Sequence, residues 1–314
     1  MRYEAVDRVP FFEEGIRKEV LKIWRRQGLA RGSDLSTMFS YDRLEHIELD
    51  LDPRPGLKKW PSSFSQLDAL RQRLNPEDTR RLPWRWRRKV RKWRNRDHVL
   101  MLRVHQGFFL SMGVSGWKRF KEVIRLLIKD PELVREVMMV QGRFAARLTE
   151  RLFEDVDIDA AVFVEPICEN RGPLISPKMY EELVLPSYQP LLEVLSRNGV
   201  ETIIFLSFTN PRLLIPSILK WGFNCLWAYE VKMEAMDYQD LRREFGRDLR
   251  LIGGLDLDTL HRGKKAIRRE IEEKVPPLLA NGGYIPMVDG RVREDIPFDN
   301  YIYYRRTLEK VIQG

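Results

Sequence analysis

Several polar side chains stand where short apolar runs of the sequence stop, and their types suit proton transfer. The run AAVFV is followed at once by Glu165, and the run VLMLRV is followed by His105. Carboxyl, phenol and imidazole groups are the usual general acids and bases of enzymes. At the ends of such runs we therefore predict four catalytic residues: Glu165, Asp289, His105 and Tyr229.

A second set of side chains at the same positions would bind and orient a substrate. Hydroxyl and amide groups form hydrogen bonds with neutral groups, whereas guanidinium groups pair with carboxylates. The predicted substrate-binding residues are Ser207, Asn210, Arg171, Arg291, Glu230 and Asp256. No thiol and imidazole groups accompany them at a spacing typical of a metal site, so no metal ligand is predicted. The scattered carboxylates leave open a metal other than zinc.

Most of these candidates also have a structural interpretation. Burial would raise the pKa of Glu165 and keep it protonated, whereas a nearby Arg171 or Arg291 would keep it ionised. Glu165 could instead cap the helix start at Ser176 or form an ion pair with an arginine. The remaining alternatives are a structural His105, a surface-loop position for Tyr229 and Glu230, an N-cap role for Asp256, and an ion pair between Asp289 and Arg291.

The elements that would position these residues alternate between short apolar strands and longer amphipathic helices. Strand-like runs cover residues 98–104, 160–165, 201–207, 223–229, 249–254 and 283–289, with two more at 8–14 and 46–52. Helical patterns cover residues 15–26, 116–151, 177–197, 211–220, 238–245, 259–279 and 300–312. Eight strands alternating with helices predict an α/β fold, a (β/α)8 TIM barrel forming a single domain over residues 1–314, with its active site at the carboxyl ends of the strands. The alternative, an open doubly wound sheet, would normally carry a Gly-rich phosphate turn that this sequence lacks.

The composition is that of a soluble globular protein. With 314 residues, 43% of them hydrophobic, the chain can bury a large core. Its first residues, MRYEAVDRVPFFEEG, contain no apolar stretch long enough for a signal peptide, and no later run reaches the length of a membrane span. Cys168 and Cys225 are too few for a disulfide framework and too far apart for a CxxC site. We therefore predict a cytoplasmic protein with free thiols and no membrane contact.

The net charge of +9 comes from one segment. Residues 80–96, RRLPWRWRRKVRKWRNR, begin at Arg80, end at Arg96, and hold ten Lys or Arg and no acid, so the rest of the chain is close to neutral. If this excursion is helical, Trp86, Val90 and Trp93 share one face. The cationic remainder is either a solvated face or a docking surface for an acidic protein or polyanion. Nucleic acid is disfavoured because no nucleic-acid-binding motif accompanies the segment.

The segment NRGPLISPKMYEELVLPSY (170–188) resembles the helix opening GPLISPxMxxxxxxPxY of the uroporphyrinogen decarboxylase superfamily. Other pieces agree in order: RVPFFEEG, LIKDPELVREVM, LRLIGGLD, and EKVPPLLANGGYIP followed by DIPFDNYIYY. The resemblance covers most of the chain and implies a TIM-barrel fold. The superfamily contains porphyrinogen decarboxylases and zinc-dependent methyltransferases that exchange methyl groups with corrinoids.

Two departures from the superfamily bear on the reaction. Where the methyltransferases carry a His-x-Cys zinc pair, with a further Cys near the loop at residues 287–289, this sequence has Leu206, Ser207 and Phe208. Hydroxyl and phenyl groups do not replace thiolate and imidazole as tetrahedral zinc ligands. Where the decarboxylases carry an Arg-Gln-Ala-Gly-Arg signature that grips carboxylates, this sequence has RVPFFEEGIRKEV, in which Glu13 and Glu14 would repel such groups.

The resemblance and its departures give three hypotheses for function. The first is methyl transfer between a small methylated substrate and a corrinoid, without the family's zinc and with a proton from one of the four catalytic candidates. An acidic corrinoid protein would then dock on the basic helix, and no other cofactor is predicted. The second is decarboxylation of a porphyrinogen or another carboxylated substrate held by Arg171 and Arg291. The third is a non-catalytic barrel used for binding or assembly.

Overall fold

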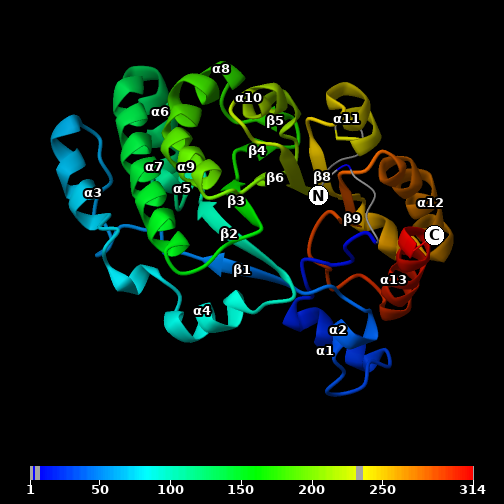
Figure 1. The fold of residues 1–314 in the computed structure, drawn as a ribbon. Coiled ribbons are helices and arrows are strands. Elements are labelled where there is room, and N and C mark those ends of the chain that lie inside the picture. The colour runs from blue at the N-terminus through cyan, green and yellow to red at the C-terminus, as the bar shows by residue number, and fades with distance from the viewer. Residues whose placement is uncertain (1–2, 4–7, 231–235, 314) are drawn as a thin grey trace. The chain divides into compact units, whose positions relative to one another are not determined.

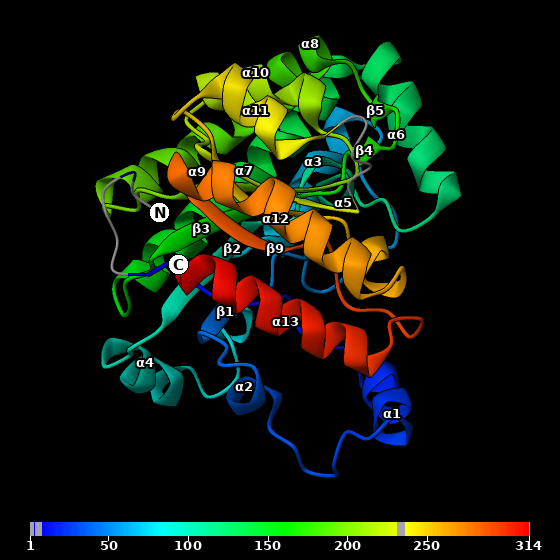
Figure 2. The ribbon, with the colours of Figure 1, turned by 90° about the vertical axis from the view of Figure 1, so that its right-hand side faces the viewer.

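The computed structural model describes residue 3, residues 8–230 and residues 236–313. The chain forms two compact units, and Figures 1 and 2 show its ribbon from two directions. The central unit consists of Leu44–Ser207 and Leu213–Asn224. The terminal unit consists of Met1–Arg43, Phe208–Arg212 and Cys225–Gly314.

Parallel strands form the sheet of the central unit. Their order is β1-β2-β3-β6, with β1 at Leu44–Glu48, β2 at Val99–His105, β3 at Ala160–Glu165 and β6 at Ile203–Phe208. Parallel strands are covered on both faces and need near-continuous apolar runs, which AAVFV and IIFL supply. Glu165 lies in register with Ser207, so the carboxyl ends of β3 and β6 meet at one edge of the sheet.

Three long helices of the central unit pack against one another in the order α6, α7, α9 (Figure 1). They span Trp117–Lys129, Pro131–Phe153 and Leu185–Arg197. The predicted helix at 116–151 is divided in two because the Asp130 side chain caps α7 and Pro131 occupies its first turn. The other elements of this unit are α3 (Leu67–Arg73), α4 (Trp86–Arg94), α5 (Phe108–Ser111), β4 (Cys168–Glu169), β5 (Gly172–Pro173), α8 (Pro177–Met179), α10 (Ile215–Lys220), and the short turns η1 (Phe64–Gln66), η2 (Thr79–Arg81) and η3 (Tyr180–Val184).

The terminal unit contains the parallel strands β7 (Cys225–Tyr229), β8 (Arg250–Leu255) and β9 (Tyr284–Val288), in that order. Its helices are α1 (Lys18–Arg26), α2 (Leu35–Met38), α11 (Tyr238–Phe245), η5 (Leu257–His261), α12 (Lys264–Ala280) and α13 (Phe298–Gln313), and the turn η4 (Arg212–Leu214) begins in this unit. Helices α12 and α13 lie side by side (Figure 2). Among the described residues of either unit, no helix is both long and apolar enough to span a bilayer.

The strand predicted at residues 8–14 does not form, so the described chain has seven of the eight parallel strands that a closed barrel needs. Pro10 has no backbone N–H to donate. The backbone groups of Phe11 are used by Asp42: its N–H donates to the Asp42 carboxylate at 2.7 Å, and its carbonyl accepts the Asp42 N–H at 2.8 Å. One parallel bridge, between Ile16 and Val292, follows this segment. The other predicted strands are confirmed, with β1 displaced toward the N-terminus by two to four residues.

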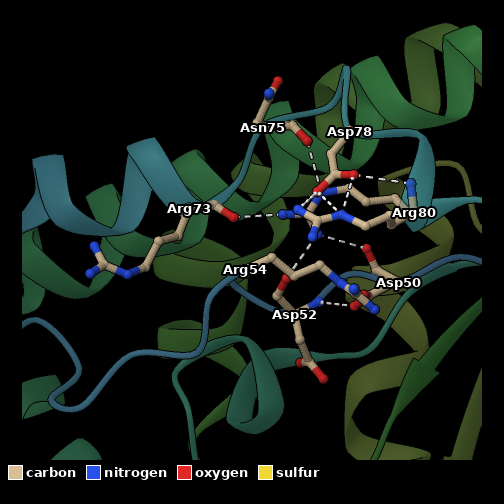
Figure 3. A network of polar contacts seen from close by, with 8 residues as sticks. Asp50, Asp52, Arg54, Arg73, Asn75, Asp78 and Arg80 are labelled. Atoms are coloured by element: carbon tan, nitrogen blue, oxygen red, sulfur yellow. Dashed lines mark hydrogen bonds and ion pairs between the residues drawn. The ribbon is translucent and has the colours of Figure 1, made fainter.

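The basic segment forms the predicted helix α4, but one of its arginines turns inward. Val90 and Trp93 are buried, and the Trp86 indole donates to Asp155 at 2.6 Å. Arg81 is 1% exposed, and Figure 3 labels the four residues whose carbonyls accept its hydrogen bonds. Its guanidinium donates to the backbone carbonyls of Asp50, Asp52, Arg73 and Asn75, at 2.5 to 2.9 Å. This arginine therefore holds together the long connection between β1 and β2.

Gly142 lies where α7 and α9 approach each other closely. A Cβ atom at this position would lie 1.8 Å from the backbone oxygen of Ser187. Gly142→Ala should therefore force the helices apart and lower the free energy of unfolding by about 1–3 kcal/mol, measured by urea unfolding. Gly56→Ala is the control, because a Cβ there would have no neighbour within 4 Å. Equal stability of the two variants would contradict the close helix contact.

Candidate functional site

A buried carboxyl group at the end of β3 is the centre of the candidate site in the central unit. Glu165 is 0% exposed. Its Oε1 accepts the N–H of Phe108 at 2.8 Å, and its Oε2 accepts the hydroxyls of Tyr180 at 3.0 Å and Tyr188 at 2.5 Å. These hydrogen bonds join the end of β3 to the segment that follows β2 and to the helix after β5.

The helix after β5 brings both tyrosines to Glu165 because it contains a π-helical turn, η3. An α-helix rotates about 100° per residue, so residues eight positions apart would lie roughly 80° apart around the axis. A π turn takes up one extra residue, so that Tyr180 and Tyr188 are separated by about two full turns and share a face. Such turns occur often at functional sites. Both tyrosines belong to the segment that carries the family resemblance.

Gly107 and His105 complete the surroundings of this carboxyl. Gly107 has φ +84°, and a Cβ there would lie 2.5 Å from Val164 O and 2.7 Å from Glu165 Oε1, so only glycine fits. Its N–H donates to Nδ1 of His105 at 3.0 Å. The His105 ring centroid lies 4.5 Å from that of Tyr188. Burial lowers the pKa of His105 to about 3, so this imidazole is neutral, which favours its structural interpretation.

Glu165 can carry a proton near neutral pH. Burial raises its pKa to about 7, although the hydrogen bonds from Tyr188, Phe108 and Tyr180 act in the opposite direction. Neither structural alternative is seen, since its two oxygens bond to those three donors and Ser176 itself caps the Met179 N–H. When Glu165 is protonated, its O–H must donate to a neighbouring oxygen, and the tyrosine hydroxyls supply one.

The residues at the end of β6 do not fit the zinc of the methyltransferases. The Ser207 hydroxyl donates to the backbone oxygen of Glu165 at 3.1 Å, and Leu206 is buried in the core. Burial raises the pKa of the Cys168 thiol to about 12, which opposes a thiolate ligand. In the described part of the chain, no three His, Cys, Asp or Glu side chains group as metal ligands.

The other predicted catalytic residues lie in the terminal unit, at the ends of its strands. Asp289 is 6% exposed, and its Oδ1 accepts the Leu257 N–H at 3.0 Å. Its backbone oxygen accepts the N–H of Glu230, an exposed residue with φ +52°. Tyr229 is 8% exposed and its ring packs against Phe208, so it does not lie on a loop surface. Asp289 and Tyr229 are therefore largely buried, and Glu230 is a surface residue.

Three predicted binding residues have structural partners. Asp256 caps η5 through the Asp258 N–H at 2.8 Å, as its structural interpretation expects. Asn210 Oδ1 accepts the Arg212 N–H at 3.2 Å. Arg291 pairs with Glu14, its Nε lying 3.1 Å from the Glu14 carboxylate. Arg171, in contrast, is exposed in the turn between β4 and β5.

A second buried carboxyl, Glu13, lies in the terminal unit. It accepts hydrogen bonds from Arg305 at 2.9 Å and from the Tyr304 hydroxyl. Burial raises the pKa of Glu13, and the charge of Arg305 opposes this rise by favouring the ionised carboxylate. Arg305 is 1% exposed, and its guanidinium carbon lies 3.4 Å from the Phe11 ring centroid. Glu13 and Glu14 therefore neutralise arginines of this chain.

The sequence analysis did not select Tyr180, Tyr188 or Gly107, which lie against Glu165, or Arg305, which pairs with Glu13. Tyr180 and Tyr188 stand inside a recognised motif, and their eight-residue spacing does not match one face of a regular helix. Gly107 follows β2 by two residues, which was the available signal for a tight turn. Arg305 lies 292 positions from Glu13, so only the folded chain pairs them.

Comparison with known proteins gives the family. A family model described as uroporphyrinogen decarboxylase (URO-D) matches residues 109–307. The chain belongs to the uroporphyrinogen decarboxylase family. Uroporphyrinogen decarboxylases of Nostoc sp., Trichormus variabilis and Nostoc punctiforme are each 20% identical over 200 residues, which is 63% of this chain and 53% of the relative. The match thus spans about half the length of these relatives.

A solved structure extends the likeness beyond the segment that the family model matches. A methyltransferase from Methanosarcina mazei is similar with a TM-score of 0.62 at 14% identity, covering 98% of this chain and 95% of that protein. At this identity the likeness shows the fold alone. This member of the uroporphyrinogen decarboxylase family therefore has an α/β fold, and its described residues form a sheet of seven parallel strands, which is consistent with a TIM-barrel-like fold.

The Glu165→Gln variant tests the protonation of the central carboxyl. The pKa of Glu165 is about 7 when folded, against 4.5 as the ordinary value. Its stabilising contribution is therefore complete below pH 4.5 and is lost as pH rises to about 7, at up to about 1.4 kcal/mol per pH unit. The free energy of unfolding of wild type relative to Glu165→Gln should fall across this window in urea titrations. Glu13 is present in both proteins, so the pH dependence that it adds to the free energy of unfolding cancels in this difference.

The matched control for this titration is Glu154→Gln, which removes an exposed carboxyl. Its free energy of unfolding should follow that of wild type at every pH. A difference between wild type and Glu165→Gln that stays constant from pH 4 to pH 8 would contradict a protonated Glu165.

Proposed function

We propose that this chain transfers a methyl group between a small methylated substrate and a corrinoid, without the zinc ion of the related methyltransferases. The observation that carries this choice is the ion pair between Arg291 and Glu14 at 3.1 Å. Arg291 is one of the two arginines that the decarboxylation hypothesis assigns to a substrate carboxylate, and here it already pairs with Glu14. Arg305, the buried arginine of the same unit, is likewise committed to Glu13.

The reaction needs a proton because zinc is not available to activate the leaving group. The bond between the methyl carbon and the substrate heteroatom breaks, and its electron pair stays on the heteroatom. A proton from the chain neutralises that heteroatom. The corrinoid, in its cobalt(I) form, accepts the methyl group and supplies both electrons of the new bond. Glu165 is the proton source in this proposal, because a pKa near 7 suits a general acid at neutral pH.

Tyr180 and Tyr188 act as positioning residues. The two tyrosines lie on the helix after β5, and their hydroxyls donate to Oε2 of Glu165 at the end of β3. The Phe108 N–H donates to Oε1. Fixing a catalytic group on rigid elements keeps it in the geometry that proton transfer requires. Ser207 would support the carboxyl from β6 through its bond to the Glu165 backbone oxygen.

The test is formation of methylcobalamin, followed by its absorbance, from cob(I)alamin and a panel of methyl ethers, methylamines and methyl thioethers. At least one class should react. Glu165→Gln should lower kcat by about 100-fold or more, because it removes the proton donor and keeps the shape. Glu154→Gln, the exposed control, should retain full activity. Failure of every class, or an unchanged kcat for Glu165→Gln, would overturn the proposal.

Decarboxylation of a porphyrinogen or another carboxylated substrate is the second candidate. The relatives matched above are named uroporphyrinogen decarboxylases. Arg171 is exposed, and no described carboxylate pairs with it, so it could hold a substrate carboxylate. Release of CO2 from uroporphyrinogen, with no methylcobalamin formed, would establish this function. If the protein shows neither activity, the third hypothesis, a non-catalytic barrel, is favoured.

We also propose that helix α4 docks the acidic protein that carries the corrinoid. Its inner face is used by Val90 and Trp93. Its outer side exposes cations, and no described carboxylate pairs with these four of them: Arg87, Arg88, Arg91 and Lys92. A surface of one charge sign steers an oppositely charged partner and loses this effect in high salt.

Replacing these four residues with Gln should lower transfer to a corrinoid bound to an acidic protein by about tenfold at low salt. Transfer to free cob(I)alamin should be unchanged. The control replaces three exposed lysines elsewhere, Lys178, Lys265 and Lys310, with Gln. A loss of the same size in the control, or with free cob(I)alamin, would contradict docking at α4.

A further inference from the structure

A groove of about 880 Å³ lies in the central unit, and none of the predicted site residues lines it. One wall is formed by residues 57–62, in the connection that follows β1, with Gln66. The other wall is formed by residues 113–122, in the connection that follows β2 and the start of α6. In parallel α/β sheets, ligands bind beyond the carboxyl ends of the strands, which is where both connections begin.

The groove carries an uncompensated positive charge. Arg119 and Glu122 pair with each other, and Arg119 also donates to the backbone oxygen of Met112 at 3.0 Å. The other cations of the lining are Lys58, Lys59 and Lys118. All three are exposed, and among the described residues no carboxylate forms an ion pair with them. A concave surface that gathers one sign of charge concentrates ligands of the opposite sign.

Two tryptophans line the same groove. Trp60 lies against the backbone of Gly113, where a Cβ atom would come within 2.0 Å of the indole, so a side chain at 113 would displace this ring. Trp117 is 76% exposed, and its ring meets Phe120 edge-on at 5.5 Å, which leaves much of the indole available. An exposed large aromatic ring beside unpaired cations is typical of a surface that stacks a flat ring and holds its charged groups.

We propose that this groove binds a ligand with an aromatic ring system and at least two negative charges, as a nucleoside phosphate has. The ring would stack on Trp117, and the anionic groups would pair with Lys58, Lys59 and Lys118. The volume lies within the range of sites for ligands of this size. A small neutral methylated substrate needs neither the charge nor the volume, so this site stands apart from the proposed reaction and does not depend on it.

Titration calorimetry with four probes tests the ligand chemistry: ATP, adenosine, tripolyphosphate and the aromatic tricarboxylate trimesate. ATP should bind at least tenfold more tightly than adenosine, which lacks the charge, and than tripolyphosphate, which lacks the ring. Its affinity should fall as salt rises. Trimesate distinguishes the two sources of negative charge. If it binds at least as tightly as ATP, the groove accepts carboxylates, and if it binds more weakly, the groove prefers phosphates. The proposal is overturned if neither ATP nor trimesate binds, or if tripolyphosphate matches ATP.

Two variants locate the binding. The triple variant Lys58→Gln, Lys59→Gln, Lys118→Gln should lose at least tenfold in affinity for the tighter of ATP and trimesate, and Trp117→Gln should lose affinity for the same probe. All four side chains are exposed, so both proteins should keep the wild-type Tm. The control variant Lys178→Gln, Lys265→Gln, Lys310→Gln removes the same charge outside the groove and should bind as wild type does. Unchanged affinity in the triple variant, or an equal loss in the control, would show that the groove is not the site.

Discussion

The set of hydrogen bonds to the Glu165 carboxyl is the constraint on which the central unit depends. A carboxyl group that is 0% exposed must have its oxygens satisfied, because an unpaired buried polar atom costs on the order of 1–3 kcal/mol. Its three donors come from the start of α5, from the π turn η3 and from α9. The same requirement fixes a glycine at 107 and a π turn at 180–184. The carboxyl that we propose as the proton donor thus also constrains the local fold.

The terminal unit solves the same problem with a charged pair. Glu13 and Arg305 are both almost fully buried, and aromatic rings of Phe11, Tyr41 and Tyr304 surround the guanidinium. Burying one charge without its partner would be strongly unfavourable, so the N-terminal segment is tied to α13. The segment aligned with the carboxylate-gripping signature of the decarboxylases therefore serves the structure of this unit. This use of the segment, together with the ion pair between Glu14 and Arg291, supports the proposal of methyl transfer over decarboxylation.

The surface charge divides in a comparable way between structure and recognition. The Arg81 guanidinium donates its hydrogen bonds to backbone carbonyls. The four cations Arg87, Arg88, Arg91 and Lys92 of α4 and the three lysines of the groove face solvent, and no carboxylate among the described residues pairs with them. The number of Lys and Arg residues does not distinguish a structural arginine from a recognition surface, since Arg81 and its exposed neighbours belong to one basic run. An inward arginine stabilises a long connection, whereas an outward one costs little to keep and is available to a partner.

The sequence by itself determined the family, the alternation of strands and helices, and the carboxyl ends at which chemistry was expected. Apolar runs such as AAVFV specify buried parallel strands wherever they lie, and the Ser176-Pro177 pair specifies a helix start, because both are local signals. Tertiary structure decided the rest. The run at 8–14 has a strand-like composition, but Asp42 takes the backbone groups of Phe11. The partners of Glu165, Arg291 and Glu13 lie far along the chain or across an irregular turn, and only packing brings such groups into hydrogen-bond distance.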